Sequence, residues 1–438
     1  MSRILRMLCI LAVLCFAIPP SIVGAAASGL PPGCTQTTKG QETIVTCLPP
    51  VLWNHDLVVF AHGYEFANPL DPMAMPKLGS EQWVVQLSGG ATSLPELLMG
   101  LGFGFAATSY SKDGLAVQEG VTEMKALVDD IRAHNLVRNV YIVGASEGGL
   151  VTTLSLERYP DTYKGGLALC GPVGDFQKQI NYWGDFRTAF DVYFPGLPAD
   201  AVNIPLPLMG DWVASPSATQ LGIINQLGNP ANSTKVGQLL ALTGAPIDLT
   251  SPTTIATTTG LTTLGILTYN ILATNEARLE LGGTPPGIQP YDNNANLVLQ
   301  LLPGVKTYTA SAGAPAAILP YQTTGLLKKP LVTMHNVGDP IVPVWHEGYY
   351  QAKAALAGSS VNLTQLAVPT YGHCNFTPGQ TLFAFAMMLY KANHMPINLS
   401  VFAPLLASDA NGAADFNLLN AQYGDISRVK MFFPVVGK

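Results

Sequence analysis

Apolar and polar positions follow two alternating patterns over most of the chain. Short, nearly continuous apolar segments are typical of strands buried on both faces of a parallel sheet. The longer segments Val117–His134, Leu150–Tyr159 and Phe383–Lys391 carry apolar residues at helical spacing instead. This strand–helix alternation predicts an α/β fold with a doubly wound, mostly parallel sheet. The predicted strands are Leu57–Phe60, Phe103–Thr108, Val140–Val143, Gly166–Leu169, Leu331–Met334 and Gln365–Val368.

The alternation stops between residues 175 and 325. Joints rich in Pro, Gly, Asn and Thr separate helix-like pieces there, and only 8 of the 125 residues from 201 to 325 are charged. A structureless loop of this length is rare inside a compact domain, so we predict a largely helical cap inserted at 175–325. The core then comprises residues 28–174 and 326–438, and the Thr-rich stretch Thr253–Thr263 is expected to be a mobile loop. The predicted cap helices are Gln220–Leu227, Lys235–Leu242, Leu264–Leu281 and Asn294–Leu302.

The first 27 residues have the pattern of a secretory signal peptide. Arg3 and Arg6 precede the apolar stretch Met7–Ile18, and small residues follow up to Ala27. We expect cleavage near Ala27 and a secreted or periplasmic protein. After cleavage, no apolar run approaches the ~18 residues needed to span a bilayer, so no stable membrane span is expected.

The charge balance removes another class of partner. Lys+Arg number 22 and Asp+Glu 28, a formal net charge of −6. Nucleic-acid binding depends on a basic surface that replaces the counterions of the phosphates, so we expect no nucleic-acid partner.

Gly144-Ala145-Ser146-Glu147-Gly148 carries the strongest chemical signal. A G-x-S-x-G sequence between a buried strand and a helix is typical of a strained turn that exposes a nucleophilic serine. The alternative interpretation is an ordinary glycine-rich turn between a strand and a helix.

Ala61-His62-Gly63-Tyr64 follows the predicted strand Leu57–Phe60 directly. Main-chain N–H groups at such a position can stabilise a developing oxyanion, and we expect Tyr64 N–H and Glu147 N–H to do so. The His62 side chain is interpreted as a structural hydrogen-bonding group.

Two further loops supply an acid and a base. Asp339 follows the strand Leu331–Met334, and His373 follows the strand Gln365–Val368. An acid that orients an imidazole, and an imidazole that reaches Ser146, would complete a catalytic triad. Asp175 is an alternative acid. His335 and His346 are alternative bases.

The remaining histidines show no pair at zinc-ligand spacing, so we expect no metal and no cofactor. Four cysteines lie beyond the signal peptide: Cys34, Cys47, Cys170 and Cys374. Cys34 and Cys47 flank the strand-like segment Glu42–Thr46 and are expected to pair, which leaves Cys170 for Cys374; four free buried thiols are the alternative.

These motifs, in this order, resemble the α/β-hydrolase superfamily over about Pro49–Gly171 and again from Lys329 to about Asn393. The resemblance implies Ser146 as nucleophile, His373 as general base and then acid, and Asp339 as the orienting acid. It also places lids or caps between the sixth and seventh strands of the sheet. A cystine beside the catalytic histidine is similar to the tannase and feruloyl-esterase branch, from which this chain departs by having Ala145 beside the nucleophile.

The sequence therefore predicts a secreted serine hydrolase that cleaves carboxylic esters of apolar or aromatic substrates, small or polymeric, through an acyl-enzyme. The alternatives are a serine peptidase of the same fold, resembling prolyl oligopeptidases, a polyester depolymerase, and a non-catalytic binding protein on a hydrolase scaffold. An aromatic set in the first part of the cap is interpreted as core, or alternatively as a wall of the substrate pocket. Its members are Tyr182, Trp183, Phe186, Phe190, Tyr193 and Phe194.

Overall fold

Most of the chain is described by a computed structural model. It covers residues 30–67, 74–87, 90–197, 212, 217–282, 289–301, 304–398, 402 and 410–424. The predicted signal peptide, residues 1–27, lies outside the described residues. Among the described residues, no helix combines the length and the apolar character that crossing a bilayer requires.

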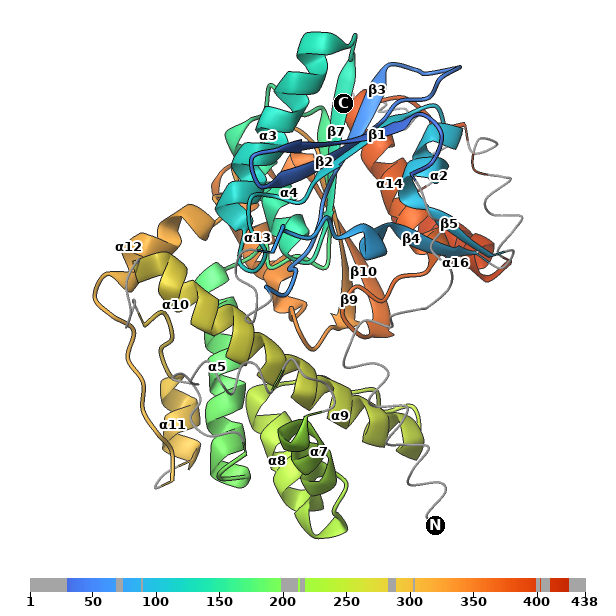
Figure 1. Cartoon of the computed structure of the whole chain (residues 1–438). Helices are drawn as coiled ribbons and strands as arrows, with labels where there is room; N and C mark the ends of the chain where they lie inside the picture. Colours follow the sequence, from blue (N-terminus) through green and yellow to red (C-terminus); the bar gives the residue numbers. More distant parts are fainter. Residues whose placement is uncertain are drawn as a thin grey trace, which may run out of the picture.

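A single large sheet forms the centre of the fold (Figure 1), and it contains eight of the strands that the described residues form. The first two strands pair antiparallel with each other and β2 pairs antiparallel with β6, whereas the remaining neighbours are parallel. In spatial order the strands are β1 (Cys34–Lys39), β2 (Glu42–Cys47), β6 (Gly104–Thr108), β3 (Asp56–Ala61), β7 (Asn139–Ala145), β8 (Gly165–Leu169), β9 (Leu331–Gly338) and β10 (Leu363–Tyr371). This architecture confirms the predicted fold class.

Helices cover both faces of this sheet because successive strand residues point to opposite sides. In β3, Leu57 and Val59 pack into the core beneath α3 (Val117–His134) and α4 (Glu147–Arg158). Val58 and Phe60 pack into the core on the other face, against α2 (Leu94–Gly100), α14 (Pro378–Asn393) and α16 (Ala410–Tyr423). α13 (Trp345–Leu356) contributes Tyr350 to the first of these cores. A short 3-10 helix, Ser80–Trp83, leads into a separate hairpin of β4 (Val84–Leu87) and β5 (Gly90–Ser93).

A helical insertion separates β8 from β9, as predicted. Figure 1 shows its helices grouped beside the sheet, in green to orange. Most of them share a third apolar core, whereas Ala277, Leu281 and Ile318 pack in the first core, with the sheet. The cap boundaries 175 and 325 remain a prediction. The helices are α5 (Phe176–Tyr193), α7 (Ala218–Leu227), α8 (Ser233–Thr243), α9 (Pro252–Tyr269), α10 (Asn275–Gly282), α11 (Ala295–Leu301) and α12 (Ala314–Ile318), with a π-helical turn at Asn270–Thr274 and short 3-10 turns at Pro230–Asn232 and Leu319–Tyr321.

The prediction of a mobile loop at Thr253–Thr263 is wrong, because this stretch forms most of α9. Threonine is a weak helix former, but two features stabilise it here. Ser251 and Thr254 form a capping box around Pro252 at the first helical position. Within the helix, the Thr258 hydroxyl donates to the Thr254 carbonyl at 2.7 Å, one turn earlier.

The aromatic set of the insertion is core. Phe186 and Phe190 are fully buried in the apolar core of the insertion, together with Trp183. The Tyr182 hydroxyl and the Trp183 ring nitrogen donate to main-chain carbonyls just after Asp339, at 2.9 and 3.0 Å. These residues therefore attach the insertion to the loop after β9.

Candidate active site

Ser146 occupies a sharp turn between β7 and α4. Its backbone angles, φ 55° and ψ −122°, are strained for a residue with a side chain. A Cβ atom at Gly144 would lie 2.1 Å from the Gly148 carbonyl oxygen, and one at Gly148 would lie 2.0 Å from the Ala61 carbonyl oxygen. Both glycines are therefore required by close backbone packing, and the strained turn presents the Ser146 side chain at the carboxyl edge of the sheet.

Three predicted residues form one hydrogen-bonded chain. His373 Nε2 lies 2.8 Å from Ser146 Oγ, and His373 Nδ1 lies 2.7 Å from Asp339 Oδ2. Asp339 is completely buried, and its other oxygen accepts from Ile341 N–H at 2.9 Å and Val342 N–H at 3.0 Å. Its carboxylate is thus fixed in the orientation that holds the imidazole toward the serine.

The alternative acid has a different role in the structure. Asp175 is the N-cap of α5, where its side chain accepts from Lys178 N–H at 3.1 Å. The same oxygen accepts from the Gln322 side-chain amide at 2.9 Å. The geometry therefore favours Asp339 as the partner of His373.

The alternative bases are both enclosed by other partners. His346 accepts at Nδ1 from Gly174 N–H at 3.0 Å, and burial lowers its pKa well below the usual value. His335 is fully buried and lies 2.7 Å from the Val342 carbonyl oxygen and 3.3 Å from a Glu347 carboxylate oxygen. Burial opposes its charged form, but the carboxylates of Glu347 and Asp339 outweigh that effect and raise its pKa.

His62 is a structural residue, as predicted from its position. Its ring stacks on Tyr110 with the ring centroids 4.0 Å apart, and its Nδ1 lies 2.7 Å from the Gly63 carbonyl oxygen. Burial lowers its pKa, which disfavours the charged form of the ring.

The two predicted oxyanion donors belong to segments that lie next to Ser146. A Cβ atom at Gly63 would lie 3.2 Å from Ser146 Cβ, so the segment Gly63-Tyr64 passes directly beside the serine. Gly63 N–H donates to Gln82 Oε1 at 2.8 Å, whereas Tyr64 N–H has no acceptor among the described residues. Glu147 is the first residue of α4, so its N–H has no acceptor within the helix and lies at the positive end of the helix dipole. Gln82, which the sequence did not indicate, orients the segment Gly63-Tyr64 through its bond to Gly63 N–H.

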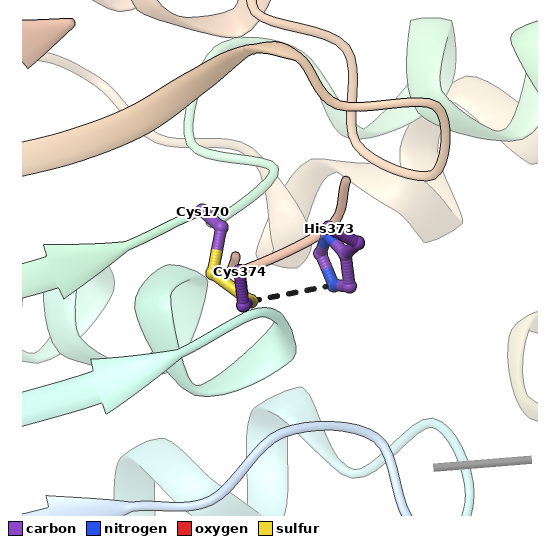
Figure 2. A group of neighbouring side chains, drawn as sticks. All are labelled: Cys170, His373 and Cys374. Carbon is purple, nitrogen blue, oxygen red and sulfur yellow. Dashed lines mark hydrogen bonds between the residues drawn. A yellow bond between two sulfur atoms is a disulfide. The ribbon is translucent and has the colours of Figure 1, made fainter. Parts of the chain in front are cut away.

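A cystine lies against the histidine (Figure 2). Cys170 and Cys374 are joined with their Cα atoms 5.3 Å apart, and Cys374 Sγ lies 3.6 Å from His373 Nε2. Cys34 and Cys47 are joined as well, across the β1–β2 pair. The group of Cys170, His373 and Cys374 could suggest a metal site, but both sulfurs are already bonded to each other, and thiolates are the ligands that such a site requires.

A cavity of about 640 Å³ opens at Ser146 and extends along the sheet. Its volume is in the range that accommodates small-molecule ligands. The walls are mostly apolar and come from β3, β7, β8, α2 and α14, with Tyr269 contributed by the insertion. Among the lining residues are Val58, Phe60, Leu98, Val143, Leu167, Leu169, Leu382 and Phe385. The aromatic set of α5 is not among the described residues that line it.

Comparison with known proteins finds only distant structural similarities. No protein-family model matches this chain, and no curated protein sequence matches it. Similar solved structures include an esterase from Aspergillus oryzae, at 14% identity and a TM-score of 0.39, with 82% of this chain and 79% of that chain covered. Feruloyl esterase B from the same organism is 14% identical with a TM-score of 0.38, covering 79% and 75%. Proline iminopeptidase from Mycobacterium smegmatis is 9% identical with a TM-score of 0.36, covering 82% and 98%.

These similarities are too weak to transfer an activity. The fold is instead defined by the molecule itself. It has a mostly parallel sheet covered on both faces, a strained serine turn after β7 and a helical insertion after β8. The chain has the α/β-hydrolase fold.

Proposed function

We propose that the protein is a serine hydrolase that cleaves carboxylic esters through an acyl-enzyme. The observation that carries the proposal is the hydrogen-bonded chain from Asp339 through His373 to Ser146, which ends at the mouth of an apolar cavity. A carboxylate, an imidazole and a hydroxyl in this arrangement make the serine oxygen nucleophilic at neutral pH.

The reaction follows from the positions of these groups. His373 Nε2 accepts the Ser146 proton as the oxygen attacks the ester carbonyl, and Tyr64 N–H and Glu147 N–H stabilise the negative charge that develops on the carbonyl oxygen. His373 then donates that proton to the leaving alcohol. Water, deprotonated by the same imidazole, hydrolyses the acyl-enzyme and restores Ser146.

The cavity supports an apolar acyl group as substrate. Most of its wall consists of aliphatic and aromatic side chains of the sheet, α2 and α14, which favour binding of hydrocarbon over water. Two cystines support export to an oxidising compartment, as the signal-peptide prediction also implies.

The peptidase alternative needs acidic groups that bind a substrate amine. The cavity wall contains two carboxyl groups that would have to do so, those of Glu65 and Glu81. Burial and a hydrogen bond to Glu81 raise the pKa of Glu65 to about 8, so its carboxyl is largely neutral at pH 7. The other walls of the cavity are mostly apolar, so an ester with an apolar acyl group is the better-supported substrate.

A substrate panel with the purified mature protein tests the proposal. We expect turnover of p-nitrophenyl esters, little turnover of aminoacyl nitroanilides, and a loss of about 10⁶ in kcat for Ser146→Ala. A serine-directed phosphonate should label the wild type once, at Ser146. Nitroanilides that outperform every ester would favour the peptidase, and hydrolysis of a solid polyester film in preference to soluble esters would favour the depolymerase. Turnover that survives in Ser146→Ala would overturn the proposal.

A further inference from the structure

Three consecutive main-chain N–H groups in the loop between β6 and α3 each donate a hydrogen bond to a different segment near the active site. Gly114 N–H donates to the Glu65 carbonyl at 2.7 Å, beside Tyr64. Leu115 N–H donates to Glu276 Oε2 at 3.0 Å, and Ala116 N–H donates to Glu147 Oε1 at 3.1 Å. Residues 114–116, which we name the hub loop, therefore contact both segments that carry the proposed oxyanion donors.

Glu276 links the hub loop to the first of these donors by a second route. The Tyr64 hydroxyl donates to Glu276 Oε2 at 2.5 Å, the same oxygen that Leu115 N–H binds. The approach is so close that a Cβ atom at Gly114, which has φ +82°, would lie 2.4 Å from Glu276 Oε2. The positive φ favours glycine at 114, and any side chain there would displace the Glu276 carboxyl group.

Glu276 comes from the insertion, 212 residues after Tyr64 in the chain. It follows the π-helical turn Asn270–Thr274, a type of irregularity that is frequent at functional sites. Tyr269, just before that turn, lines the cavity, and its ring centroid lies 5.7 Å from that of Tyr64. One turn after Glu276, Glu280 forms an ion pair with Lys112 at 2.8 Å. Glu276 therefore contacts Tyr64 and the hub loop, whereas Glu280 binds Lys112, outside the hub loop.

We propose that Glu276 is a positioning residue, which acts with the hub loop to hold the main-chain N–H of Tyr64 at a fixed distance from that of Glu147. The inference rests on the proposed function, since it assigns a role in stabilising the oxyanion of ester hydrolysis. Tyr64 follows β3, whereas Glu147 begins α4 after β7. Among the described residues, the hub loop donates hydrogen bonds to both of these segments and to Glu276. Because a displacement of ~1 Å in a catalytic group can cost ~10²-fold in rate, such a connection bears directly on kcat.

The test uses variants that remove the link while leaving every oxyanion N–H in place. Tyr64→Phe deletes only the hydroxyl, whereas Glu276→Leu deletes the oxygen that accepts from both Tyr64 O–H and Leu115 N–H. We expect each to lower kcat by about tenfold with KM changed by less than about twofold, because the interaction matters in the transition state. The double variant should be no slower than Glu276→Leu alone, since that variant already lacks the bond to the Tyr64 hydroxyl. Glu276→Gln keeps an acceptor oxygen and should retain most of the wild-type kcat.

An inhibitor measurement separates positioning from general stability. A trifluoromethyl ketone with the acyl chain of the best ester forms a tetrahedral adduct whose oxygen occupies the oxyanion position. Its affinity should fall in Tyr64→Phe by the same factor as kcat/KM. The control, Glu280→Gln on the same helix, should leave both quantities unchanged.

Three outcomes would overturn the proposal. They are unchanged kcat and inhibitor affinity in Tyr64→Phe and Glu276→Leu, additive losses in the double variant, and a loss confined to KM or to melting temperature. Ser146→Ala, measured in parallel, keeps the two hypotheses apart. If Ser146→Ala is inactive while Tyr64→Phe is fully active, the positioning role fails and the esterase proposal stands. If Ser146→Ala retains turnover, the proposed function itself fails.

Discussion

Cys374 follows His373 directly in the chain, and its disulfide with Cys170 connects the histidine loop to the end of β8. Both cysteines have positive φ angles, 48° and 52°, a conformation that residues with side chains adopt at a cost in energy. The cystine thus maintains a backbone arrangement that places His373 beside Ser146.

Cys374→Ser should lower both the melting temperature and kcat. The bridge joins residues 204 positions apart and encloses the whole insertion, and the chain-entropy model assigns such a loop on the order of 5 kcal/mol as an upper value. Loss of the tether should also loosen the His373 loop, so kcat should fall by about 10-fold or more. Thermal unfolding and ester kinetics of the variant and of mildly reduced wild type provide the measurement. Cys34→Ser with Cys47→Ser is the control for losing a cystine away from the histidine. Peptide mapping that finds free Cys170 and Cys374 would contradict this account.

Asp339→Asn should lower kcat by roughly 10⁴, because an amide cannot hold His373 in the tautomer that accepts the serine proton. The matched comparison is Asp175→Asn, which keeps a side-chain oxygen to cap α5 and should leave kcat near the wild-type value. Steady-state kinetics of the two variants decide between the acids. An Asp339→Asn enzyme with wild-type kcat would reverse the assignment.

The parts of the fold that sequence predicts are those set by local patterns. Buried runs such as Val140–Val143 identify strands because β7 is covered on both faces, and the strained turn at Ser146 needs glycines whose spacing is visible in the sequence. Asp339 and His373 are visible as candidates because each comes just after a recognisable strand. The prediction of a loop at Thr253–Thr263 was wrong because it gave more weight to the low helix propensity of threonine than to the helix start at Ser251-Pro252, which the sequence also contains.

The connections around the oxyanion segments could not be predicted in the same way. Leu115 and Glu276 are 161 residues apart, and neither belongs to a motif. Gln82 lies on a short 3-10 helix without a periodic pattern. Such contacts depend on how the insertion packs against the core, which periodicity does not specify.

The acyl preference should depend on Leu382, which lines the cavity from α14. Leu382→Phe adds volume to the wall, and we expect kcat/KM for long-chain p-nitrophenyl esters to fall by about tenfold while that for the acetate ester changes little. Leu389→Phe is the matched control, since Leu389 packs in the same core two turns later and does not line the cavity. A chain-length series from acetate to palmitate measures the ratio. An equal loss for short and long esters, or the same shift in Leu389→Phe, would indicate that this cavity does not bind the acyl group.

The dependence of stability on pH should include a contribution from Glu147. Burial raises the pKa of its carboxyl to about 8, and the nearby Glu276 carboxyl acts in the same direction. An unfolded glutamate has a pKa of about 4.3, so between about pH 4.3 and pH 8 the folded protein retains a proton that the unfolded chain releases. Stability therefore falls as the pH rises through this window, because the folded state binds more protons than the unfolded state.

Glu147→Gln removes this titration while keeping an oxygen that can accept from Ala116 N–H. The variant and the wild type should have similar melting temperatures near pH 5, where both side chains are neutral in the folded state. The variant should become the more stable of the two as the pH approaches 8, by an increasing margin. Differential scanning calorimetry across pH 5–8 measures that margin, and Glu280→Gln on α10 shows how much any exposed carboxyl contributes. A difference between variant and wild type that stays constant over the window would mean that Glu147 is ionised in the folded protein, held as a carboxylate by Ala116 N–H.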